Sequence, residues 1–178
     1  MLDDPFTFNP VARITVGAIG RPGHRTFFLQ ASQGERVLTL KLEKEHLYAL
    51  ARGIDNLLEE LERDEICAQL PAQVPSASAL ALQEPIDCAY QIVQMGLAYD
   101  QTSRLILLVA FAAAIADETD TAHAHFWATM DQMRCLSRRA REVAAQGRPI
   151  CPLCQQPMDP DGHTCPRHNG HSRKPFAR

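Results

Sequence analysis

The N-terminal part of the chain alternates short apolar segments with polar breaks. Residues 12–19, 26–31 and 36–42 are rich in β-branched, aromatic and aliphatic side chains, and polar or glycine-containing breaks separate them. This pattern is typical of strands joined by short turns and predicts an antiparallel meander. In the first break, Pro22 and Gly23 fit the two central positions of a type II turn, which needs a fixed φ followed by a positive φ.

The pattern then changes to a helical period. Over residues 43–64, apolar side chains recur every three or four positions and charged side chains occupy the other face, so we expect an amphipathic helix lying on the sheet. The apolar positions are Leu47, Leu50, Ile54, Leu57 and Leu61. Residues 65–85 lose this period and contain three prolines, which indicates a linker.

The same order of elements recurs after the linker. Strands are expected at residues 87–99, 104–113 and 122–128, and a helix at residues 130–145. A shift of 86 positions places Leu47 on Met133 and Leu50 on Leu136, which favours an internal duplication. The second helix should begin with a capping box, because a glutamine follows Thr129 at the third position.

These patterns predict an α+β fold of two tandem βββα units with antiparallel sheets, followed by a small zinc-knuckle module. The expected boundaries are 1–64 for the first unit, 65–85 for the linker, 86–147 for the second unit and 148–178 for the C-terminal module. Met133 and Leu136 join the leucines of the first helix as expected core residues.

The C-terminal module is predicted from the stretch CPLCQQPMDPDGHTCPRHNGH. Cys151 and Cys154 have the two-residue spacing at which a tight turn directs two thiolates at one tetrahedral ion, and Cys165 supplies a third sulfur. Three free thiols and a redox Cys-x-x-Cys are the alternatives. Redox chemistry favours a motif at a helix start, whereas Pro152 follows the end of the predicted helix. Metal binding is therefore the preferred interpretation.

The fourth ligand is a histidine that spacing alone does not identify. His168 repeats the Cys-x-x-Cys geometry after Cys165, while His163 and His171 are also within reach. Three thiolates and one imidazole fill a zinc tetrahedron and leave no open position for an activated water. We therefore expect a structural Zn²⁺. Elsewhere, His123 and His125 alternate on one predicted strand without a third ligand nearby, so exposed or packed side chains are the better interpretation.

Charge is distributed unevenly along the chain. The net charge of −3 divides into −9 over residues 1–133 and +6 over residues 134–178. Arg134, Arg138 and Arg141 share one face of the second helix, and further basic residues follow in the tail. Such a surface can bind an anionic partner, or its charges can pair with acidic groups within the fold. No apolar run approaches the roughly 18–20 residues that a membrane span needs, and we expect a soluble, cytoplasmic protein without a membrane partner.

With these residues in view, the chain resembles an uncharacterised bacterial family, domain of unknown function 3090. The resemblance covers nearly the whole length and is carried by GRPGHRTFFLQA, LEKEHLYALA, MGLAYD and, most specifically, GRPICPLCQQPMDPDGHTCPRHNGH. The family's Gly-His-x-Cys-Pro-Arg-x-Asn-Gly pattern implies His163 as the fourth ligand rather than His168. Gln155 stands where the family commonly has a glycine after the second cysteine, and no ligand is affected. The resemblance implies no reaction.

The sequence thus favours a non-enzymatic, zinc-stabilised scaffold or adaptor that docks a protein partner through its C-terminal module. The expected partner-binding residues are Arg167, Asn169, Arg173, Lys174 and Arg138. Nucleic-acid binding through the same basic residues is the first alternative, and it would be salt-sensitive. An enzyme with a pocket between the two units is the second.

Overall fold

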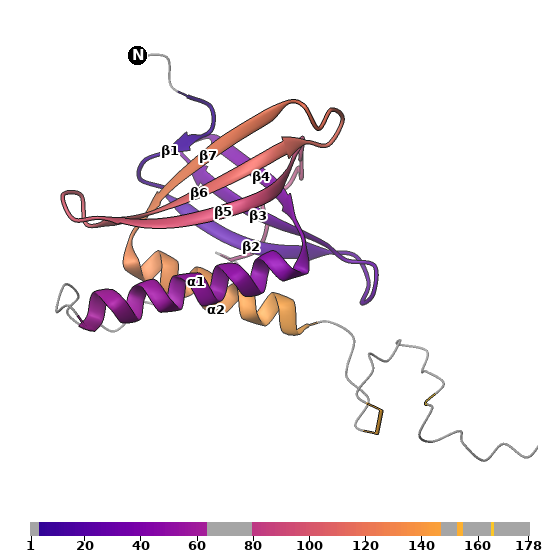
Figure 1. Ribbon diagram of the computed structural model, residues 1–178. Helices are drawn as coiled ribbons and strands as arrows, with labels where there is room; N and C mark the ends of the chain where they lie inside the picture. The colour runs from indigo at the N-terminus through magenta and orange to yellow at the C-terminus, as the bar shows by residue number, and fades with distance from the viewer. Residues whose placement is uncertain (1–3, 64–79, 147–152, 155–164, 166–178) are drawn as a thin grey trace, which may run out of the picture.

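The computed structural model describes residues 4–63 and 80–146, together with residues 153, 154 and 165. These residues form seven strands and two helices (Figure 1). In chain order the elements are β1 (Thr7–Phe8), β2 (Arg13–Ile19), β3 (Thr26–Gln33), β4 (Arg36–Leu42), α1 (Lys44–Arg63), β5 (Tyr90–Asp100), β6 (Leu105–Ala114), β7 (Thr121–Ala128) and α2 (Met130–Ala145). Among the described residues, no helix is both long enough and apolar enough to cross a membrane.

All seven strands belong to one mixed sheet in the order β1-β7-β6-β5-β4-β3-β2. The α+β class is confirmed, whereas the expectation of two antiparallel sheets is wrong. β4 and β5 pair in parallel, with Leu40 opposite Tyr90 and Lys41 opposite Gln91, and α1 lies in the connection between them. A parallel pair needs such a crossover, which a hairpin turn cannot supply. The element order βββα does occur twice after β1, but the internal duplication itself stays a prediction.

The sheet is strongly curved, and a short segment links its two ends. β1 pairs in parallel with β7, at the opposite end of the sheet from β2. Immediately after β1, the Val11 N–H donates to the Trp127 carbonyl (2.8 Å) and the Ala12 N–H donates to the Ser32 carbonyl (2.8 Å). Residues 7–12 therefore connect the last strand of the sheet to the hairpin of β2 and β3.

Both helices cover the concave face of this sheet and pack against each other (Figure 1). Leu47 and Ile54 of α1 and Met133 and Leu136 of α2 have no exposed surface, as the helical period predicts. Burying such a side chain contributes about 1.5–3 kcal/mol. Leu57 is only half buried, and its neighbour Leu58 takes the core position instead.

Local sequence signals account for two of the boundaries. At α2, the Thr129 hydroxyl accepts from the Gln132 N–H and the Gln132 side chain accepts from the Thr129 N–H, so the expected capping box is present. Between β2 and β3, the His24 N–H donates to the Arg21 carbonyl (2.8 Å) and Gly23 has φ +92°. This positive φ at the third position confirms the predicted type II turn.

Residues 80–84, assigned to the linker from sequence, lie across the outer face of the first strands. The Thr15 hydroxyl donates to the Leu80 carbonyl (2.9 Å), and Gln30 bonds both the carbonyl and the N–H of Gln83 (2.9 and 2.7 Å). A Cβ at Gly17 would stand 2.6 Å from the Leu82 side chain, so only glycine permits this approach. The segment explains why polar side chains are buried on that face.

Candidate functional site

The predicted metal site is described in part. Cys154 is half buried, and Cys165 is 5% exposed. Cys151, His163 and the alternative ligand His168 lie outside the described residues. Within the described part of the chain, no three His, Cys, Asp or Glu side chains gather as a metal site would require, but only two of the four expected ligands belong to that part. Chemically, the four-residue set of three thiolates and one imidazole fits structural zinc, which soft donors bind in a closed tetrahedron.

The predicted partner-binding residues are also mostly outside the described chain: Arg167, Asn169, Arg173 and Lys174. Arg138 is described, and it lies exposed on α2 with its Nη2 donating to Cys135 Sγ at 3.8 Å. The structure therefore places one of these five residues on an accessible helix face, about two turns before α2 ends at Ala145.

The other two arginines of that face are held by α1. Arg134 donates to Glu62 (2.6 Å), and this hydrogen bond is the main reason that the pKa of Arg134 lies above its ordinary value. Arg141 forms an ion pair with Asp55, whose second oxygen accepts from the Ser137 hydroxyl (2.6 Å). Much of the helix's positive charge is thus directed at acidic residues of the same fold, which was one of the two outcomes that the charge asymmetry allowed.

The two histidines of β7 have packing partners. The exposed His123 ring meets Phe111 edge to face, with 4.8 Å between centroids. His125 Nδ1 lies 3.5 Å from the Thr7 hydroxyl. Both histidines therefore match the packed interpretation.

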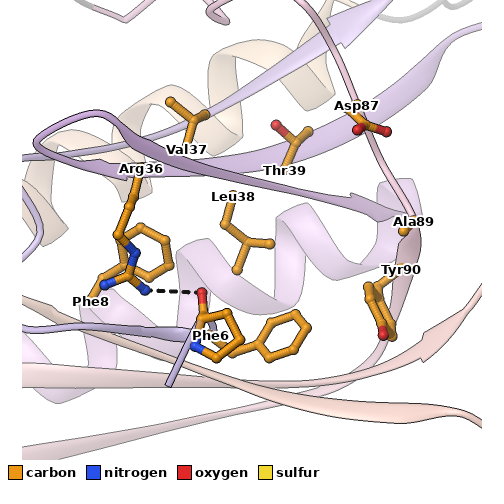
Figure 2. Close-up of a pocket in the computed structure, with 10 residues that line it drawn as sticks. Phe6, Phe8, Arg36, Val37, Leu38, Thr39, Asp87, Ala89 and Tyr90 are labelled. Atoms are coloured by element: carbon orange, nitrogen blue, oxygen red, sulfur yellow. Dashed lines mark hydrogen bonds between the residues drawn. The ribbon is translucent and has the colours of Figure 1, made fainter. Parts of the chain in front are cut away.

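A pocket whose residues the sequence did not identify lies where residues 5–8 meet β4 and the start of β5 (Figure 2). Its volume is about 420 Å³. Arg36 holds the wall in place: its Nη2 donates to the carbonyls of Asp4, Pro5 and Thr7 at 3.0–3.1 Å. The same guanidinium lies 4.7 Å from the centroid of the Phe8 ring, within the range of a cation–π contact.

Aromatic rings form the other side of the pocket. Phe6 and Tyr90 pack edge to face with centroids 5.3 Å apart. The Tyr90 hydroxyl donates to Asp120 (3.1 Å), and this bond raises the pKa of Tyr90. Asp87 lies at the rim with its carboxylate exposed (Figure 2). The arrangement suits an apolar or aromatic group with a positive charge near Asp87. The signal in the sequence is the pair of phenylalanines in PFTFNP, a segment in which the sequence pattern predicts no helix or strand.

The sequence profile of a family described as "Protein of unknown function (DUF3090)" matches residues 6–165. The chain belongs to this family. No curated protein and no solved structure matches the chain.

The DUF3090 match includes the predicted zinc ligands but ends before the predicted partner-binding residues of the tail. All four expected zinc ligands lie within residues 6–165, and Cys165 is the last residue matched. Arg167, Asn169, Arg173 and Lys174 follow it. The match also includes all of the sheet from Thr7 onward, both helices and nearly all of the pocket lining.

Proposed function

We propose that this DUF3090 protein is a non-enzymatic scaffold or adaptor, stabilised by zinc, that docks a protein partner through its C-terminal module. The observation that carries the proposal is the donor set Cys151, Cys154, His163 and Cys165, contained within the family match and with Cys165 only 5% exposed. Three sulfurs and one ring nitrogen complete a tetrahedron, so the ion would hold the chain together rather than activate water.

The two helices offer a rigid base for this module. α2 is the last element before it, and α2 is fixed to α1 by Arg134, Ser137 and Arg141. At its far end, the Gln146 carbonyl accepts from Arg25 of the β2–β3 turn. In this proposal the partner binds Arg167, Asn169, Arg173 and Lys174 and also Arg138, which is exposed on α2. Arg134 and Arg141 are paired with carboxylates and so add little to a cationic surface. Nucleic acid requires a more extended cationic surface than this, which favours a protein partner.

Metal analysis with native mass spectrometry tests the zinc assignment. The intact chain should carry one Zn²⁺, and Cys154→Ser should lose it because one of four ligands is removed. Cys88→Ser is the matched control, since Cys88 lies two residues before β5, outside the predicted ligand set, and its loss should leave the metal in place. Hydrogen exchange should show Cys154→Ser loosening residues 148–178 while the sheet and both helices keep their protection.

Three results would overturn the proposal. The zinc assignment fails if the intact chain, purified without chelator, contains no stoichiometric zinc. The docking role fails if a partner isolated with the intact chain binds Cys154→Ser equally well. A metal ion with an exchangeable water, whose chelation abolishes a reaction without loosening the module, would favour an enzyme instead.

A further inference from the structure

β5 has an open edge along most of its length. β4 pairs with β5 only at Tyr90 and Gln91, because β4 ends at Leu42. From Ile92 to Asp100, β5 pairs with β6 alone within the described chain. A strand with a single neighbour directs the N–H and C=O of every second residue away from the sheet. This edge therefore presents main-chain donors and acceptors to whatever lies beside it.

α1 runs alongside the open edge, and together they enclose a groove of about 520 Å³. Figure 1 shows the helix following β5 from the point where β4 ends. Most of the lining is small or apolar: Ala49, Leu50, Gly53, Leu57, Val93, Met95, Gly96 and Leu97. α1 comes close to β5 at Gly53, where an added Cβ would stand 3.2 Å from the Leu97 side chain. The groove also explains why Leu57, which the helical period assigned to the core, is only half buried.

The edge lacks most of the features that keep sheet edges from pairing. Proteins usually protect an open strand with charged residues, proline or a bulge. From Ile92 to Tyr99 the strand contains neither a charged residue nor a proline. Its one irregularity is the bulge at Val93, whose side chain is 64% exposed. An apolar edge without charge or proline, beside a groove, is the geometry of strand addition, in which a peptide gains main-chain hydrogen bonds from the strand and side-chain contacts from the groove.

We propose that this groove binds an extended peptide segment of a partner protein as an added strand beside β5. The helix wall selects a lone segment, because a second copy of the chain would bring its own neighbouring strand and helix against α1. Among the described residues that line the groove, Glu60 is the only Asp, Glu, Lys or Arg, so the segment carries Lys or Arg at that end and small or apolar residues elsewhere. Residues 93–97 offer an edge of about 16 Å, enough for roughly five residues. None of the described residues that line this groove belongs to the cysteine module.

Peptide selection tests this proposal directly. Random octapeptides displayed on phage are selected against the full chain, and the enriched sequence is synthesised and titrated by fluorescence anisotropy. We expect alternating apolar residues and one Lys or Arg. Ala49→Arg, which fills the groove from an exposed helix position, should weaken binding at least tenfold, whereas Ala145→Arg on α2 should not change it.

A charge pair and a backbone pair of variants make the test specific. Glu60→Lys should weaken binding, and Glu59→Lys, also exposed on α1 but outside the groove, should not. The peptide is N-methylated either at its odd-numbered or at its even-numbered residues. Only one of these two peptides should lose binding, because every second peptide N–H faces β5. Hydrogen exchange should show new protection within residues 93–97 when the peptide is bound.

Four results would overturn the proposal. They are the absence of any enriched peptide, equal binding by Ala49→Arg and Glu60→Lys, an edge whose amides are already protected in the peptide-free monomer, and a concentration-dependent dimer that Ala49→Arg dissociates. The third would assign the groove to another segment of this chain, and the fourth would assign it to a second copy. None of these outcomes bears on the zinc content that tests the proposed function.

Discussion

Gln30 holds residues 80–84 against the sheet, and its replacement by leucine isolates this role. The side chain is fully buried and makes four hydrogen bonds. Its amide N–H groups donate to the Thr39 hydroxyl (3.0 Å) and the Gln83 carbonyl (2.9 Å), and its amide oxygen accepts from the Gln83 N–H (2.7 Å) and from Arg13 (3.2 Å). Leucine occupies a similar volume but can satisfy none of these partners.

The magnitude depends on which partners water can reach after the substitution. Arg13 keeps a second acceptor, the Ala81 carbonyl. Thr39 is only 4% exposed, and the Gln83 main chain faces the sheet, so these groups lose their partners in a buried place. A buried polar group left without a partner costs about 1–3 kcal/mol, and movement of residues 80–84 toward water relieves part of this. We therefore expect Gln30→Leu to lower the free energy of unfolding by about 2–4 kcal/mol.

Urea unfolding followed by circular dichroism measures this loss, and hydrogen exchange locates it. Gln33→Leu is the matched control on the same strand, because Gln33 is half buried and makes one exposed bond, to the Asn9 carbonyl. It should lose less than about 1 kcal/mol. Compared with the unsubstituted protein, Gln30→Leu should speed amide exchange at residues 80–84 more than in β3. A loss equal to that of the control, with unchanged exchange at residues 80–84, would refute the reasoning.

Two further predictions concern single positions. Thr129→Ala removes the capping box of α2 and should cost about 1 kcal/mol in urea unfolding, with Thr119→Ala in an exposed turn as the comparison, and an equal loss in both would contradict it. Burial raises the pKa of the Cys88 thiol, so less thiolate is present near pH 8 and iodoacetamide should label Cys88 more slowly than the same residue in the urea-unfolded chain, as peptide mass mapping can measure; equal rates would contradict it.

Local patterns in the sequence predicted the elements well. The observed β4 and α2 begin and end where the pattern placed them, and α1 differs by one residue at each end. These elements are specified by their own residues, through the leucine period in α1 and the capping box before α2. β1 was missed because its two residues are too few to show a period, and it exists only because β7 offers an edge to pair with.

Long-range pairing could not be predicted from local signals. Each set of three strands forms the expected antiparallel meander. The two sets are joined by the parallel pairing of Leu40 and Lys41 with Tyr90 and Gln91, and this pairing depends on where the connection through α1 places the start of β5. The pocket of Figure 2 and the groove beside β5 both result from this joining. Similarly, the charge asymmetry was visible in sequence, whereas the pairing of Arg134 with Glu62 required the antiparallel packing of the two helices.

The contact between β1 and β7 has a consequence for the order in which the protein folds. Thr7 and His125 are 118 positions apart, so the contacts that fix residues 7–12 span most of the folded part of the chain. Closing so long a loop is entropically costly, and folds that depend on such contacts form slowly. During synthesis the first residues must wait until β7 has left the ribosome before their partners exist. Co-translational folding of this protein should therefore not begin with its N-terminal strand, which can pair only after β7 has emerged.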